Sequence, residues 1–163
     1  MTYEALVNIF KDAAASYVPI NPFPALPYPN KPLQFHYDNV WYNNGAASND
    51  YPSMLFECSP DFELKGYQSN NRTGLQTFNG KLFFYDNFWE GERAIKDVWV
   101  KQSQLNELAL QTLGEIKRRA DLVPLQIEFG KGFFGKDVHN PKLVQVFIPF
   151  TVTLKSECTL LPV

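Results

Sequence analysis

Residues Leu143–Leu154 carry the pattern that most constrains how this chain can fold. Alternate positions in this segment are apolar, namely Val144, Val146, Ile148, Phe150, Val152 and Leu154. A period of two places these side chains on one face of an extended strand. Gln145, Thr151 and Thr153 fall on the opposite face. Because such a strand must bury its apolar face, the pattern predicts a sheet covered by helices or by a second sheet.

The composition fits one globular domain. The 163 residues are enough to bury a core, and we see no boundary or repeat, so one domain over residues 1–163 is predicted. Aromatic residues make up 15%, which favours ring-rich core and interface surfaces. Fifteen basic and seventeen acidic residues give a net charge of −2, which disfavours a dedicated nucleic-acid binder. No segment resembles a signal peptide or a membrane span.

Two segments have the apolar spacing of amphipathic helices. The first begins at the N-terminus and ends before Pro19, with apolar residues three and four apart. The second begins near Asp97 or Ser103 and ends in Lys117–Arg119, a basic run that suits the negative end of a helix dipole. Gly114 lies inside the second helix and costs about 1 kcal/mol relative to Ala, which suggests close packing at that position.

Several segments are predicted to be strands. They are Leu33–Tyr37, Val40–Asn43, Tyr51–Glu57, Leu75–Tyr85, Leu125–Phe129 and Leu143–Cys158. Gly80 indicates a bulge or a close approach within its strand. Residues 59–74 are polar and rich in turn formers, so they predict a long exposed loop or a ragged hairpin. With the helices, these strands predict an α/β (α+β) domain, whose mixed or mostly antiparallel sheet is flanked by two helices.

A search for catalytic patterns finds none that fits its context. Gly130–Gly135 matches the GxGxxG spacing, but another strand follows it instead of a helix, so we interpret it as a flexible hairpin tip. His36 and His139 have no partner at metal-ligand spacing, and no GxSxG motif is present. The sequence therefore predicts no catalytic, cofactor-binding or metal-binding residue. A buried core thiol is the interpretation of Cys58.

Aromatic residues and prolines in predicted loops are the candidate binding residues. Six of the twelve prolines fall in Pro19–Pro32, which predicts an extended arm. The candidates are Phe133, Phe134, Trp89, Tyr67, Pro22, Pro24 and Pro27. A monomer seldom exposes so many rings, so the pattern favours a subunit that binds other protein surfaces.

Two alternative functions remain open at this point. One is a non-catalytic carbohydrate- or peptide-binding module that stacks its ligand on Trp41, Trp89 and Tyr67. The other is a small cysteine hydrolase in which Cys58 pairs with a distant histidine as the nucleophile.

A series of short motifs suggests a family. Tyr51–Glu57 has the sequence Tyr-Pro-Ser, followed by three apolar residues and Glu. Leu75–Phe78, at the start of the next predicted strand, contains a Gln-Thr pair. Phe84–Asp86 contains a Tyr-Asp pair, a Leu-rich helix follows, and Glu157-Cys158 closes the last strand. In this order, over about Met1 to Leu160, the chain resembles small neck and tail-completion proteins of tailed bacteriophages, of the tail-terminator type. The proline-rich arm departs from that family's pattern.

The resemblance implies a structural protein without enzymatic activity. Such proteins form rings that close the end of a tail tube or join it to the head–tail connector. The expected partners are therefore further copies of this chain, in a ring such as a hexamer or dodecamer, and the adjacent tail-tube and connector proteins. The resemblance also implies a place in the virion neck or tail after synthesis in the host cytoplasm, with no cofactor, no sequence-specific nucleic acid and no membrane.

Overall fold

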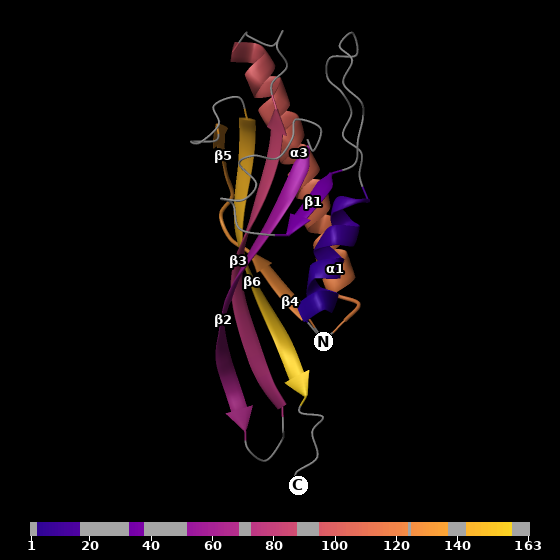
Figure 1. Cartoon of the computed structure of the whole chain (residues 1–163), viewed down its shortest axis with the longest axis vertical. Helices are drawn as coiled ribbons and strands as arrows, with labels where there is room; N and C mark the ends of the chain where they lie inside the picture. Colours follow the sequence, from indigo (N-terminus) through magenta and orange to yellow (C-terminus); the bar gives the residue numbers. More distant parts are fainter. Residues whose placement is uncertain are drawn as a thin grey trace.

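The computed structural model describes residues 3–16, 33–37, 52–68, 73–87, 95–123, 125–136 and 143–157. Their elements follow in the order α1 (Tyr3–Ala14), β1 (Gln34–Tyr37), β2 (Ser53–Gln68), β3 (Thr73–Asn87), α3 (Ile95–Ala120), β4 (Leu125–Phe129), β5 (Phe133–Lys136) and β6 (Leu143–Glu157). Both helices lie to one side of the sheet (Figure 1). The predicted α+β architecture is confirmed, whereas the arm at Pro19–Pro32 and the strand at Val40–Asn43 lie outside the described residues.

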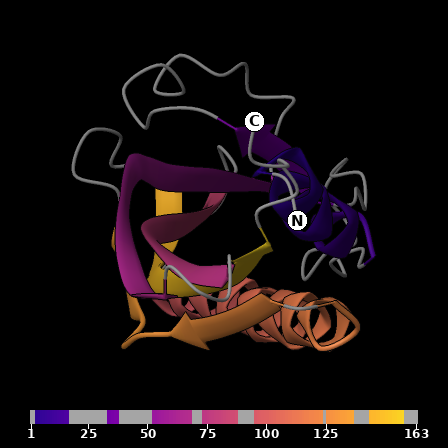
Figure 2. The same cartoon turned by 90° about the horizontal axis from the view of Figure 1, so that it is seen from below.

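The sheet is mixed and mostly antiparallel. Its strands follow the order β1-β2-β3-β6-β4, and β5 also pairs with β6. β1 runs parallel to β2, and each remaining pair is antiparallel. Strand β6 therefore lies inside the sheet. On one side it pairs with β3, and on the other side it pairs with β4 and β5. In the end-on view of Figure 2 the sheet is strongly twisted, as expected for strands of L-amino acids.

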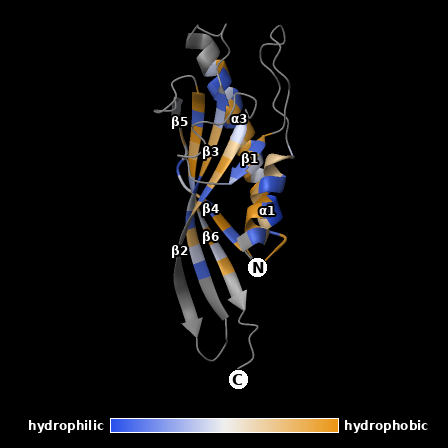
Figure 3. Cartoon of the chain, in the orientation of Figure 1, coloured by the Kyte–Doolittle hydropathy of each residue, from blue (hydrophilic) through white to orange (hydrophobic). Residues whose placement is uncertain are grey.

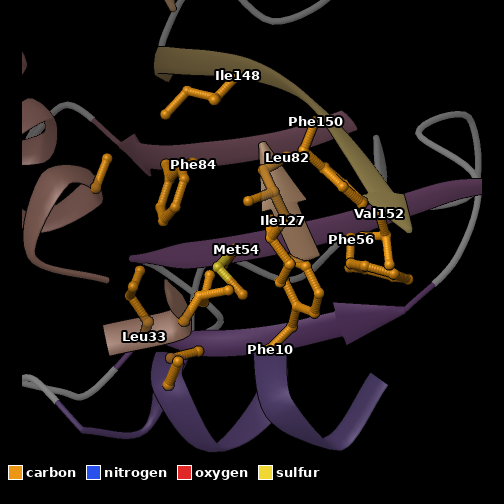
Figure 4. Packing of buried hydrophobic residues seen from close by; sticks show 14 of the residues in the cluster. Phe10, Leu33, Met54, Phe56, Leu82, Phe84, Ile127, Ile148, Phe150 and Val152 are labelled. Atoms are coloured by element: carbon orange, nitrogen blue, oxygen red, sulfur yellow. The ribbon is translucent and has the colours of Figure 1, made fainter. Parts of the chain in front are cut away.

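The core lies between one face of the sheet and the two helices. The alternate apolar residues of β6, from Val144 to Leu154, are all buried, so the predicted register is confirmed. Phe10 of α1 points into this face, where its ring centre lies 4.6 Å from that of Phe56 and 5.2 Å from that of Phe150 (Figure 4). Such tilted ring pairs add to the stability gained from burial alone.

Helix α3 buries the stripe that the sequence predicts. Its residues in or against the core are Leu105, Leu108, Ala109, Thr112, Leu113 and Ile116. Hydrophobic and hydrophilic residues interleave along both helices, as an amphipathic helix requires (Figure 3). The close packing predicted at Gly114 is wrong, because Gly114 is exposed and a Cβ added there would meet no atom within 4 Å.

Polar contacts hold α3 against its neighbours at both ends. Near its start, Nζ of Lys101 lies 3.3 Å from Oδ2 of Asp86 on β3. Near its end, Nε of Arg119 donates to Glu115 at 2.8 Å, and Nη1 of Arg119 lies 3.6 Å from the carboxylate of Asp12 on α1. Hydrogen bonds from Arg118 and then Arg119 lower the pKa of Glu115 to about 2. The second group of contacts joins the C-terminal ends of α1 and α3.

The described residues 59–68 belong to β2 and pair with β3, so the loop alternative is wrong and the ragged hairpin is confirmed. β2 continues to Gln68, β3 begins at Thr73, and the register shifts twice, between Cys58 and Phe62 and between Lys65 and Gln68. Backbone pairing with β3, which itself pairs with β6, outweighs the polar composition of this segment. The ends of β2, β3 and β6 extend together beyond both helices (Figure 1).

Gly80 lies against atoms of both neighbouring strands, which confirms the predicted close approach. It pairs with Cys58 on one side and with Phe150 on the other. A Cβ at this position would overlap the Phe150 ring and come within 2.7 Å of the carbonyl oxygen of Glu57. Glycine is therefore required here because the Phe150 ring occupies the space that a side chain would fill.

Candidate interaction surface

A bulge, and not a hairpin tip, explains the glycines at 130–132. Phe129 pairs with Phe150 and Phe133 pairs with Phe147, so three residues of the outer strand lie opposite two residues of β6. This extra residue is a β-bulge in an edge formed by β4 and β5 together. Bulges of this kind interrupt an edge that could otherwise pair with another strand.

Pro149 accounts for the position of the bulge. It has no N–H to donate, yet it lies in β6, between two neighbouring strands. The N–H of Gly130 donates to the Pro149 carbonyl oxygen at 2.8 Å, so the side of Pro149 that lacks a donor faces the bulge. A Cβ at Gly130 would come within 2.8 Å of Cγ of Pro149. The first glycine of the GxGxxG match therefore reflects packing against a proline, whereas a Cβ at Gly135 would meet no atom within 4 Å.

The predicted flexible tip at Phe133 and Phe134 is consequently wrong. Both residues belong to β5, where Phe133 pairs with Phe147 and Phe134 pairs with Val146. The sequence did not reveal that these residues lie in a strand, because glycines occur both in loops and in β-bulges. The Phe133 side chain is nevertheless 54% exposed, which agrees with its prediction as a surface ring. The side chain of Phe134 is outside what the structure describes.

Four rings form a continuous row across the face of the sheet that is turned away from the helices, which we call the far face. Tyr85 and Phe83 stack at 6.1 Å between ring centres, and Phe83 lies 5.0 Å from Phe147. Phe147 in turn stacks on Phe133 at 6.0 Å. This aromatic row (Tyr85, Phe83, Phe147, Phe133) crosses β3, β6 and β5. The contacts are cross-strand or same-face pairs, which stabilise a sheet.

Exposure increases along the aromatic row toward the edge of the sheet. At its inner end Tyr85 is buried, together with Leu55 and Leu143. Phe83 and Phe147 are partly buried, and Phe133 is exposed. The ammonium of the exposed Lys131 lies 5.8 Å from the centre of the Phe133 ring, within cation–π range. The outer end of the row therefore presents an accessible apolar surface beside a positive charge.

Two large apolar side chains are exposed on α3, on the side opposite its buried stripe and about 17 Å apart along the helix. Trp99 is 66% exposed and Leu110 is 59% exposed. Leu110 follows Trp99 by eleven residues, which is about three helical turns and brings both side chains to the same face. We call this the outer face of α3. Sequence reasoning missed it, although the spacing of two large apolar residues away from the core stripe was a usable signal.

The structure places only some of the other residues that the sequence predicted as candidates for binding or catalysis. The backbone of Tyr67 lies in β2 and not in a loop, because the hairpin extends to Gln68. Trp41, Trp89 and the prolines at 22, 24 and 27 lie outside the described residues. Cys58 is partly buried against the core, and its Sγ donates to the Asn79 carbonyl oxygen at 3.7 Å.

The described residues bring no metal-binding or membrane-spanning feature together. Among them, no three His, Cys, Asp or Glu side chains gather closely enough to hold a metal ion. The buried Nε2 of His36 has no hydrogen-bond partner in the part of the chain that the structure describes. Neither α1 nor α3 is long and apolar enough to cross a membrane. Among the described residues, exposed apolar side chains lie on the far face and on the outer face of α3.

No model of a known protein family matches this chain, and a search of curated proteins finds no match either.

Proposed function

We propose that this chain is a structural protein of a tailed bacteriophage virion, a ring-forming tail-terminator or neck subunit that joins the tail tube to the head–tail connector. The observation that carries the proposal is the order of the elements. An N-terminal helix is followed by β1 and the paired strands β2 and β3, then by the Leu-rich helix α3, and then by β4, β5 and the final long strand β6. The resemblance drawn from the sequence implies this order for the tail-terminator type.

The motifs that suggested the family lie at matching places in these elements. β2 begins at Ser53, directly after the Tyr51-Pro52 pair. The Gln76-Thr77 pair lies in the first half of β3, and Asp86 lies one residue before its end. Glu157 is the last residue of β6. Three of the four motifs therefore lie at the beginning or end of a strand, which supports a shared architecture.

Exposed apolar side chains on two sides of the subunit also support an assembling protein. Phe133 lies on the far face of the sheet, and Trp99 and Leu110 lie on the outer face of α3. Large apolar side chains exposed on separate faces are more typical of a subunit with several neighbours than of a monomer. The hairpin of β2 and β3 extends beyond the helices (Figure 1), where it is available to a further neighbour.

On this proposal the function is assembly. The sheet and helices act as a rigid wedge, and copies of the wedge close into a ring through heterologous contacts. The remaining partners are the tail-tube and connector proteins above and below the ring. The proposal includes neither catalysis nor a cofactor, and it places the protein in the virion neck or tail after synthesis in the host cytoplasm.

Negative-stain electron microscopy of the purified protein, alone and mixed with phage tail tubes, tests the proposal. We expect closed rings of uniform size in the protein alone, and rings seated on tube ends in the mixture. Particles without rings in both samples would contradict the proposed function. Specific binding to oligosaccharides or peptides by a monomer would favour the binding-module alternative.

A further inference from the structure

In the proposed function, on which this inference rests, the subunits form a ring. A ring of identical subunits restricts which two surfaces of the subunit can meet. Neighbours in a cyclic ring are related by a rotation, so the contact joins two different surfaces of the same subunit. The rotation also preserves height along the ring axis. When the long axis of the subunit lies along the ring axis, the two surfaces must lie on opposite sides of the subunit and at the same height.

The exposed surfaces on α3 and on the far face meet both conditions. The aromatic row faces away from the helices, whereas Trp99 and Leu110 face away from the sheet. The two surfaces therefore lie on opposite sides of the subunit.

Their heights can be compared through the contact between Lys101 and Asp86. Asp86 pairs with Val144, so Lys101 and Val144 lie at about the same height. Leu110 lies nine residues further along α3, about 14 Å. Phe147 lies three residues further along β6, about 10 Å. Both elements run in the same direction along the long axis (Figure 1). Leu110 is thus nearly level with Phe147 and its partner on β5.

Charges of opposite sign lie near this height on the two surfaces, although Glu57 and Glu128 also lie on the far face. Glu107 is exposed on α3, less than one turn from Leu110. On the far face, Lys81 pairs with Pro149, and Lys131 lies in the bulge opposite the same residue. Both lysines are exposed. By the same measure Glu107 lies about 9 Å along α3 from Lys101, and Pro149 lies about 17 Å along β6 from Val144. The extended Glu and Lys side chains together span the remaining difference of about 8 Å in height.

We infer that the outer face of α3 in one copy packs on the aromatic row of the next copy. Leu110 then lies over Phe133 and Phe147, and Glu107 faces Lys131 and Lys81. The occupant of the far face is a second copy of this chain. The interface continues the layering of a helix on a sheet from one subunit to the next, so each copy supplies a helix surface on one side and a sheet surface on the other.

Two variants test this arrangement in the full chain. Leu110→Asp places a charge on the helix surface, and Phe133→Asp places one on the sheet surface, at positions that are both mostly exposed. Light scattering should find each variant monomeric on its own. A mixture of the two keeps one intact pair of surfaces, the helix of the Phe133→Asp chain and the sheet of the Leu110→Asp chain. The mixture should therefore form dimers with one copy of each variant.

A charge exchange provides a matched test of the same contact. Glu107→Lys or Lys131→Glu alone should raise the dissociation constant of the ring at least about tenfold. The two changes in one chain should restore most of the affinity, since opposite charges again face each other. Far-UV circular dichroism should show wild-type secondary structure for the charge-exchange variants, because Glu107 and Lys131 are exposed.

The outcomes separate this inference from the proposed function. If the wild-type chain forms rings and the variants form the same rings, the inferred interface is wrong while the proposed function stands. If the folded single variants are monomeric and do not pair on mixing, the two surfaces do not bind each other and the inference is overturned. A wild-type chain that stays monomeric contradicts both the ring and this interface.

Discussion

The ammonium of Lys101 lies 3.3 Å from the carboxylate of Asp86, and the lysine side chain is 1% exposed. The pair joins the first half of α3 to the end of β3, on the face of the sheet that carries the core. A buried lysine is tolerated only when its charge is compensated, because water no longer solvates it. The contact therefore fixes where α3 begins to cross the sheet.

Removal of one member of this pair should be strongly destabilising. We expect Lys101→Met to lower the free energy of unfolding by roughly 3–5 kcal/mol, because it removes the ammonium that lies beside a mostly buried carboxylate. The double variant Lys101→Met with Asp86→Leu should recover much of this loss, since neither charge is then left unpaired. Denaturant unfolding of the two variants checks the expectation. Equal losses in the single and the double variant would show that the ion pair is not the cause.

Two glycine substitutions should have opposite effects. Gly80→Ala should lower the free energy of unfolding by about 1–3 kcal/mol, because the new methyl group overlaps the Phe150 ring. Gly114→Ala should raise it by about 0.5–1 kcal/mol, because the helix gains a better helix former in open space. Thermal midpoints that shift in the same direction in both variants would contradict these local structures.

The register of β6 can be tested on its two faces. Ile148→Asp places a carboxylate in the core and should lower the free energy of unfolding by roughly 3–5 kcal/mol. Gln145→Ser, on the far face, should change it by less than about 0.5 kcal/mol. Thermal unfolding of both variants is the measurement. Equal midpoints would be inconsistent with the buried face assigned to this strand.

The contacts of Glu115 should make stability depend on acid pH. Its pKa falls from an ordinary 4.5 to about 2, chiefly because Arg118 donates to its carboxylate. Since the folded pKa is the lower one, this contribution is complete above about pH 4.5 and is lost as the pH falls toward 2. The wild-type chain should therefore be more stable than Glu115→Gln at neutral pH, and the difference should shrink over this range. A difference independent of pH would contradict it.

The elements with strong periodicity could be predicted from the sequence. The alternation in β6 and the apolar stripe of α3 each reflect one buried face, and both stripes are buried as predicted. The requirement for glycine at position 80 was also visible, because a glycine inside a strand often marks a bulge or the close approach of another part of the chain. These features depend on local pattern and on burial, which the order of residues encodes directly.

The features that the sequence did not predict depend on contacts between distant residues. The bulge at 130–132 follows from Pro149 on another strand, and the extension of β2 through residues 59–68 follows from its pairing with β3. The aromatic row joins Phe83, Phe147 and Phe133 only after three strands come into register. The prediction at Gly114 was wrong because the sequence alone does not distinguish a helical glycine in close contact with another element from one on an open surface.

The central claim is that this chain is a ring-forming structural subunit, and its mass in solution tests that claim most directly. Size-exclusion chromatography with multi-angle light scattering, on the full chain over a range of concentrations, measures this mass. The account predicts one discrete oligomer whose mass is a whole multiple of the 18.7 kDa chain and stays constant on dilution until the ring dissociates. A mass of one chain at every concentration would contradict it.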